Sequence, residues 1–379
     1  MIPYLILLLV PLLFSAFAIV SRDQGRRRVL KIGIDKETRN NGFMLPAFFT
    51  IFFLLLALRD ETIGRDLLKY KYYFQRFSNL DLEVALETKP DSLFWLLDWL
   101  VGQFTHDYQW FLAVVAGLTL LPIAKLYCED REHGFLKIVL FVNLSTFVMI
   151  FSGLRQALAI SMGLIAYEFV RKKRPFWFLI CAFIAVGFHH TAFMVVGFYP
   201  LYHFPLRKKQ VWVAIPVIAL LFVFNRQIFS MITGPVNALL GEKYEATIED
   251  TGSYTMLIVF ALFAVLAYVL PNEDRMDKET LALRNFLLIT VALQCFAPIN
   301  ALAMRMNYYY IIFIPILIPR VLKYSEERFG STQRRGSVVW WVEMGITALF
   351  LLYYLYTTYV SCQTGSSALD TYPYVPFWE

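Results

Sequence analysis

The sequence predicts an all-α, polytopic integral membrane protein, a helical bundle of about twelve transmembrane helices. Of its 379 residues, 58% are hydrophobic and 17% are aromatic, which is typical of membrane proteins. Several apolar runs of about 20 residues are long enough to cross a hydrocarbon core about 30 Å thick. Lys and Arg concentrate in short segments between these runs, as their bias toward the cytoplasmic side requires. No soluble domain of ordinary size fits between the runs, so we expect one integral domain over residues 1–379.

The first run, residues 3–20, lacks a basic leader and a small-residue cleavage site, and three arginines follow it. We therefore predict a retained first helix, with both chain ends outside. Basic loops at residues 22–39, 171–174 and 207–209 then lie in the cytoplasm. The expected spans are residues 3–20, 43–58, 110–126, 135–151, 156–170, 175–188, 191–204, 211–224, 254–270, 285–299, 306–322 and 338–359.

Two polar segments are predicted to be outer, periplasmic loops. Residues 59–107 carry nine acidic and six basic residues, and residues 225–253 carry four acidic and two basic residues. Within the larger loop, residues 67–77 and 92–101 are short, aromatic-rich amphipathic runs. We expect these two runs to form helices that lie at the membrane interface.

The segment from residue 171 to residue 209 indicates where a site could lie. A single span would separate its two basic clusters across the membrane, whereas a hairpin turning at His189 and His190 keeps both clusters inside. Each arm then has only about fourteen residues, roughly 21 Å of helix, so the turn should lie below the outer surface. Polar backbone at that depth is tolerated only when it is packed in protein or lines a wet cavity.

The composition and motifs exclude several classes. The net charge is +6, but the basic residues lie mostly in short loops, which argues against nucleic-acid binding. The four cysteines form no C-x-x-C pair, so neither a zinc site nor a disulfide framework is indicated. Nucleotide-binding, nucleophile-elbow and zincin motifs are absent, and Asp81-Leu82-Glu83 is only a weak metal-binding pattern. We expect no metal and no cofactor.

In this topology, polar groups converge on the outer side of the membrane, where ionisable residues are costly and usually functional. They are Arg59 with Asp60, Arg65 with Asp66, the segment Ser152-Gly153-Leu154-Arg155-Gln156, His189 with His190, and Asn300 with Arg305. Arg155 is the clearest case, because its turn joins two short spans and should be recessed. The alternative is a structural arginine that pairs with Asp66 or Asp60.

The other candidates also have structural alternatives. His189 could be a packing histidine bonded to backbone at its turn, and His190 points elsewhere on a helix. Arg305 lies at a helix end and could extend to the interface. Tyr70 and Phe74 follow Asp66 by one and two helical turns, so they could stack on a sugar ring or pack at the interface.

Two or three arginines at an outward-facing cavity would form an anion site that suits phosphate oxygens. A neighbouring imidazole would have a lowered pKa and could serve as a general base near neutral pH. This combination within a membrane indicates chemistry on a lipid-linked phosphate.

At this point the residues form a familiar pattern. The most specific part is S-G-L-R-Q-A at residues 152–157, followed about thirty residues later by F-H-x-T-A at residues 188–192. Together with Arg59, the Gly64-Arg65-Asp66 segment, Tyr70, Phe74, Arg305 and Tyr309, it resembles the EpsG branch of the Wzy-type polysaccharide polymerases. Two departures, Arg65 where the family commonly has Thr and residues 89–92 before the second amphipathic run, concern the acceptor contacts.

The resemblance implies a GT-C-like bundle that joins undecaprenyl-diphosphate-linked oligosaccharide repeats on the outer face of the bacterial inner membrane. It implies an inverting, metal-independent glycosyltransferase that makes a capsule, an exopolysaccharide or an O-antigen. The flippase and the chain-length regulator of the same pathway would be partners, besides membrane lipid.

The resemblance also implies roles for individual residues. Arg155 and Arg305 would hold the donor diphosphate, and His189 would take the proton of the acceptor hydroxyl. Asp66 and Arg59 would shape the acceptor side. Further substrate contacts are expected from Asp60, Arg65, Tyr70, Ser152, Gln156, His190 and Tyr309.

Rival functions remain open on the sequence. An O-antigen-ligase-like transferase or a membrane acyltransferase could also use a histidine base. A transporter of lipid-linked oligosaccharides should show inverted repeats with matching broken helices, and no matching pairs are found in the two halves of the sequence.

Overall fold

The computed structural model describes residues 1–25, 43–88, 93–130, 133–231, 253–329, 337–365 and 369–379, and these are nearly all helical. The only β pairing among them is an isolated bridge between Arg59 and Pro376. Most of the basic loop at residues 22–39, the changed residues 89–92 and most of the outer loop at residues 225–253 lie outside the described residues.

The described chain divides into two compact units. The first unit comprises Met1–Glu168, Phe176–Phe193 and Gly345–Glu379, and the second comprises Phe169–Pro175 and Met194–Met344. α10 (Leu154–Arg171), α11 (Pro175–Phe188) and α19 (Val338–Thr364) each contribute residues to both units.

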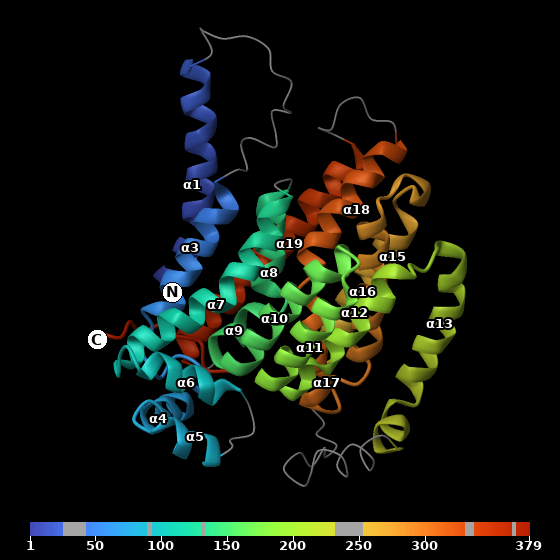
Figure 1. Ribbon diagram of the computed structural model, residues 1–379. Coiled ribbons are helices and arrows are strands. Elements are labelled where there is room, and N and C mark those ends of the chain that lie inside the picture. The colour runs from blue at the N-terminus through green and yellow to red at the C-terminus, as the bar shows by residue number, and fades with distance from the viewer. Residues whose placement is uncertain (26–42, 89–92, 131–132, 232–252, 330–336, 366–368) are drawn as a thin grey trace. The chain divides into compact units, whose positions relative to one another are not determined.

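In the first unit, α3 packs against α1 and α7 (Figure 1). Its core is aromatic: the ring of Phe141 lies 5.8 Å from that of Phe48 and 5.5 Å from that of Tyr127. The helices that lie wholly in this unit are α1 (Ile2–Gly25), α3 (Met44–Ala57), α4 (Leu67–Phe77), α5 (Leu82–Thr88), α6 (Phe94–Gly102), α7 (Tyr108–Glu129), α8 (Gly134–Asn143) and α9 (Thr146–Ser152).

In the second unit, α16 is central and contacts α12, α13, α15, α17 and α18. Phe286 of α16 lies 5.0 Å from the ring of Phe198 and 5.0 Å from that of Phe313, which forms the core of the unit. The helices of this unit are α12 (Phe198–His203), α13 (Lys208–Val223), α15 (Thr255–Val269), η3 (Glu273–Arg275), α16 (Lys278–Gln294), α17 (Ala301–Ile311) and α18 (Ile314–Phe329), preceded by the second half of η1 (His190–Gly197).

Two described helices are long and apolar enough to cross a membrane, Tyr108–Glu129 and Val338–Thr364. The number rises to five if each of three bent helix pairs counts as one span. Further apolar helices of 10–17 residues include Met44–Ala57 and Pro175–Phe188. A helical membrane protein is therefore confirmed, while the count of twelve spans stays a prediction.

Two expected spans are broken for reasons visible in the sequence. The span at residues 135–151 bends by 58° between α8 and α9, where Ser145 has a left-handed φ of 64° and Asn143 Nδ2 donates to backbone. Short polar side chains offer the backbone such alternatives to helix. The span at residues 306–322 bends by 48°. Pro315 has no N–H to donate to the carbonyl of Ile311, and in a straight helix its ring would collide with that carbonyl.

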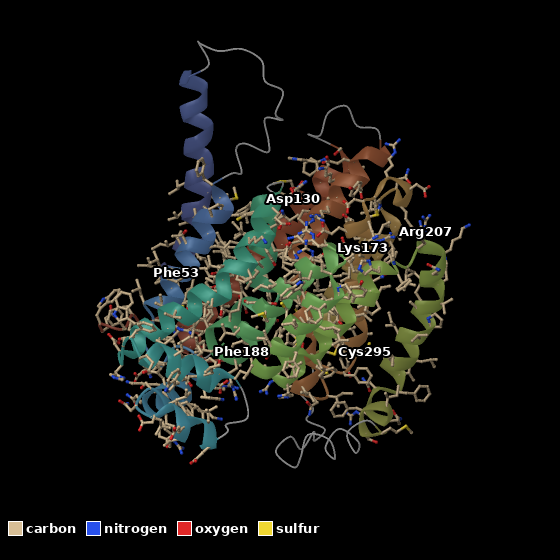
Figure 2. The ribbon with its side chains drawn as sticks, in the orientation of Figure 1. Phe53, Asp130, Lys173, Phe188, Arg207 and Cys295 are labelled. Atoms are coloured by element: carbon tan, nitrogen blue, oxygen red, sulfur yellow. The ribbon has the colours of Figure 1, made fainter. Side chains whose placement is uncertain are left out.

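The predicted helix at residues 175–188 is confirmed as α11, which ends at Phe188 (labelled in Figure 2). We expected the following arm, residues 191–204, to be α-helical throughout. Instead it begins as the 3-10 helix η1. A long 3-10 stretch often marks a functional or strained segment. Pro200 lies in the first turn of α12, where a missing N–H is tolerated.

Gly64 provides a test of the loop that follows α3. Its φ is +121°, and an added Cβ would collide with the carbonyl oxygen of Phe151. Gly64→Ala should therefore destabilise the protein by about 1–3 kcal/mol and lower its unfolding temperature in detergent. Gly117→Ala is the matched control, since its Cβ would meet only Phe53 Cε2 at an ordinary 3.8 Å. Equal unfolding temperatures for the two variants would contradict this reading of the loop.

Candidate functional site

The S-G-L-R-Q segment forms a sharp break between two helices of the first unit. α9 ends at Ser152, Gly153 follows with its N–H bonded to Met149 O at 2.8 Å, and α10 begins at Leu154. Ala157 N–H then donates to Gly153 O at 2.8 Å. Arg155 therefore lies in the first turn of α10 and is half-buried, whereas the sequence placed it in the turn before a helix that begins at residue 156.

Arg59 holds the α9 side of this break between α9 and α10. Its side chain is 1% exposed, and its Nη1 donates to the carbonyl oxygen of Phe151, at the end of α9. The guanidinium also lies 5.4 Å from the Phe151 ring. Carbonyls at a helix end lack helical partners, so Arg59 satisfies one of them. Burial lowers the pKa of Arg59 to about 10, which leaves it protonated at neutral pH.

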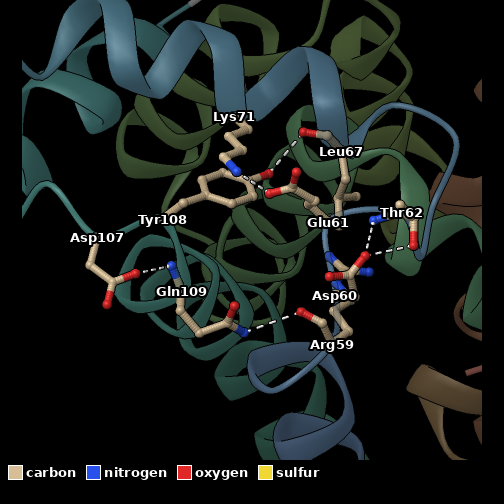
Figure 3. A network of polar contacts seen from close by, with 9 residues as sticks. All are labelled: Arg59, Asp60, Glu61, Thr62, Leu67, Lys71, Asp107, Tyr108 and Gln109. Atoms are coloured by element: carbon tan, nitrogen blue, oxygen red, sulfur yellow. Dashed lines mark hydrogen bonds and ion pairs between the residues drawn. The ribbon is translucent and has the colours of Figure 1, made fainter. Parts of the chain in front are cut away.

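The loop that carries Arg59 is held from α4 and α7 (Figure 3). Gln109 Nε2 donates to Arg59 O at 3.2 Å, and Tyr108 Oη donates to Leu67 O at 3.0 Å. Lys71 pairs with Glu61 on the same side. The loop is thus rigidly attached to the helices around it.

The C-terminal tail braces the same loop, which the sequence did not indicate. Asp60 N–H donates to Val375 O at 2.9 Å, and Phe377 N–H donates to Leu58 O at 3.0 Å. Gly64 N–H and Arg65 N–H bond to the carbonyls of Asp370 and Leu369, at 2.8 and 3.0 Å.

The acidic and basic candidates of this loop differ in their partners. Asp60 Oδ1 accepts from Thr62 Oγ1 at 2.6 Å and from Thr62 N at 3.0 Å, and the side-chain bond holds the pKa of Asp60 below its usual value. Arg65 Nε lies 3.3 Å from Asp370 Oδ2 in a pair exposed to solvent. Asp66 is half-buried at the start of α4.

α4 was predicted at residues 67–77, and the structure confirms it. Its buried residues recur at helical spacing and pack in a cluster with α6, α7 and α10. Phe74 is completely buried and stacks on Phe111 at 4.5 Å, which agrees with the packing alternative for this ring. Tyr70 is also buried, and the Arg155 guanidinium lies 6.0 Å from its ring.

Asp98 is a candidate that was not predicted from the sequence. It lies on α6, is 1% exposed, and its Oδ1 has no hydrogen-bond partner among the described residues. Burial raises the pKa of Asp98 to about 8, opposed by the positive charge of Arg155. A signal existed: Asp98 is the one acid in an apolar helix, spaced four residues after Phe94 and three before Val101, both buried.

His189 lies directly after the end of α11. Its Nδ1 is 2.7 Å from Thr191 Oγ1, its N–H donates to Ala185 O at 3.0 Å, and its carbonyl accepts from Ala192 N at 2.9 Å. The rings of His189 and His190 stack at 4.7 Å, and both side chains are half-buried. The turn thus orients His189 through its own backbone and Thr191.

One apolar cluster connects these candidates. It contains Tyr70, Phe94 and Leu154, and Phe188 packs against it. Leu93 N–H, before α6, donates to Gly187 O at 2.6 Å near the end of α11. The neighbours of Arg155, Asp98 and His189 therefore share one core of the first unit.

The remaining predicted residues lie in other surroundings. Ser152 and Gln156 are buried beside the helix break, and Ser152 Oγ has no hydrogen-bond partner among the described residues. Arg305 and Tyr309 belong to α17 in the second unit, where Arg305 is exposed and Tyr309 is buried. Asn300 caps α17 by accepting from Leu302 N at 2.7 Å.

Among the described residues, no group of three His, Cys, Asp or Glu side chains is arranged to hold a metal ion. The first unit instead offers a cation beside a buried carboxyl and an imidazole at a helix end. This set can bind an anion and move a proton.

Comparison with known proteins gives one match. The model of the EpsG family matches residues 42–375. This range includes the loop that follows α3, the break between α9 and α10, and the turn after α11. Neither the curated proteins nor the solved structures yield a match. Because the match extends over most of the sequence, the chain belongs to the EpsG family.

Proposed function

We propose that this protein is a polysaccharide polymerase, an inverting glycosyltransferase that joins polyprenyl-diphosphate-linked oligosaccharide repeats. The family supports a member of the Wzy-like polymerases. The observation that carries the specific reaction is Arg155, half-buried at a helix break beside Tyr70 and Asp98, in the unit that also positions His189.

In the proposed step, an acceptor hydroxyl oxygen attacks C1 of the donor sugar, and the bond from C1 to the diphosphate oxygen breaks. The leaving lipid diphosphate keeps the electron pair, and the hydroxyl proton passes to His189. Nδ1 of His189 contacts Thr191, so Nε2 would accept the proton. Attack from the face opposite the leaving group inverts C1.

Arg155 would stabilise the leaving diphosphate. A guanidinium presents two parallel donors to phosphate oxygens, and a site that excludes water strengthens the interaction. Because burial keeps Asp98 protonated up to about pH 8, the charge of Arg155 is not cancelled at neutral pH. A neutral Asp98 would thus leave the charge of Arg155 available to the donor.

The other predicted residues would complete the substrate contacts. Arg305 and Tyr309, one helical turn apart on α17 of the second unit, stay predicted substrate contacts. Asp66 would contact the acceptor, and Arg59 would act through the helix break that it holds. Undecaprenyl diphosphate is the proposed carrier, the outer face of the bacterial inner membrane the proposed location, and the flippase and chain-length regulator the proposed partners.

Removal of the proposed charges should abolish polymerisation. Purified Arg155→Ala and His189→Ala variants given lipid-linked repeats should make no product longer than one unit, because they lose diphosphate stabilisation and the base. Product length is measured by gel electrophoresis of the labelled glycan. Lys69→Ala, a loss of an exposed charge on α4, is the control and should give normal chains. Normal chain lengths from both site variants would refute the site assignment.

Asp98 should make stability depend on pH. The folded protein keeps the Asp98 proton up to about pH 8, whereas an Asp in the unfolded chain releases its proton at about pH 3.9. Between these values the folded state binds more protons, so the free energy of unfolding should fall as pH rises. Asp98→Asn should remove this slope between pH 5 and 8, measured by thermal unfolding.

The matched control for this experiment is Asp81→Asn, which neutralises an exposed carboxylate before α5 and should leave the slope unchanged. Above about pH 8 the ionised Asp98 would cancel the charge of Arg155, so Asp98→Asn should also flatten the alkaline limb of the pH–rate profile. Identical slopes in wild type and Asp98→Asn would show that Asp98 does not hold its proton.

A further inference from the structure

Two cavities meet at the start of α13 in the second unit, and they share no residue with the proposed reaction site. The first is a polar bay of about 930 Å³, lined by residues 207–210 and by the segment from Pro271 to Asp274. The second is an apolar groove of about 280 Å³ along α13, α15 and α16. Lys208 and Trp212 line both cavities, so polar and apolar surfaces are continuous.

The charges of the bay favour an anion. Arg207 Nη1, on the residue labelled at the start of α13 in Figure 2, lies 3.9 Å from Asp274 Oδ1. Glu273 Oε1 lies 3.4 Å from Nη2 of the buried Arg284, and its Oε2 accepts from Lys208 N at 2.9 Å. Both carboxylates of the bay thus have cationic partners, and the ammonium groups of Lys208 and Lys209 add two positive charges.

The groove suits a hydrocarbon chain. Its walls include Ile215, Val265 and Leu288, and the small side chains of Ala261 and Ala264 leave it open. Val211 is the only buried residue of α13, although most of this helix is apolar. In a candidate span, the remaining apolar side chains would face lipid. Trp212, 72% exposed, lies where the two cavities join, as expected of Trp at a membrane interface.

We propose that an anionic phospholipid binds here, with its headgroup phosphate beside Lys208 and Lys209 and one acyl chain in the groove. Basic pockets between helices on the cytoplasmic side are a recognised arrangement for anionic headgroups. The basic residues 207–209 should lie on that side, because Lys and Arg are retained in the cytoplasm. Neither cavity alone selects this ligand, whereas together they match a charged head joined to a chain.

The test is native mass spectrometry of the full chain in detergent with phosphatidylglycerol or phosphatidylcholine of identical acyl chains. Wild type should retain phosphatidylglycerol preferentially. The Lys208→Ala/Lys209→Ala variant should weaken phosphatidylglycerol binding by roughly 30-fold, with little effect on phosphatidylcholine. Ala264→Trp, which fills the groove, should weaken retention of both lipids.

The matched control is Lys172→Ala/Arg174→Ala, which removes the same charge from another basic cluster and should keep the wild-type preference. Inorganic phosphate should not displace the lipid, because it cannot occupy the groove. Equal retention of both lipids by wild type, an unchanged preference in the Lys208→Ala/Lys209→Ala variant, or displacement by phosphate would overturn the proposal.

Discussion

The hydrogen bond from buried Arg59 to the carbonyl of Phe151 is the interaction on which the proposed site depends. A hydrogen bond to a charged donor contributes about 1.5–3 kcal/mol, and the loss of either partner leaves a buried polar group unsatisfied. The bond fixes the end of α9, the position of Gly153 and hence the first turn of α10. The position of Arg155, in this first turn, therefore depends on the bond.

The same contact explains why so many polar bonds hold the loop between α3 and α4. Buried Arg59 must be held in place, and Gly64 must approach the carbonyl of Phe151 closely. α4, α7 and the C-terminal tail all bond to the segment between them. Irregular backbone within a membrane protein is tolerated where protein packs around it, and here three elements do so. In the proposed site, Arg59 would affect the substrate through Arg155, because it holds the helix break that carries Arg155.

The sequence predicted those elements whose pattern is local. The amphipathic spacing of α4 and the polar residues that end α11 gave helices with the observed bounds. The breaks at Ser145 and before Pro315 were missed, because long apolar runs look continuous when hydrophobicity alone is counted. Asp98 was missed for a related reason: it was grouped with the charge of an outer loop, although its helical neighbours are buried. The bracing by the C-terminal tail depends on contacts between residues about 300 positions apart, which no local pattern encodes.

If Arg155 receives the donor diphosphate, a map of the protein with a polyprenyl-diphosphate-linked sugar bound should show it. We expect diphosphate oxygens within about 3.2 Å of the Arg155 guanidinium and His189 Nε2 directed at the acceptor side of C1. A diphosphate bound elsewhere, with Arg155 still against Tyr70 and Asp98, would contradict it.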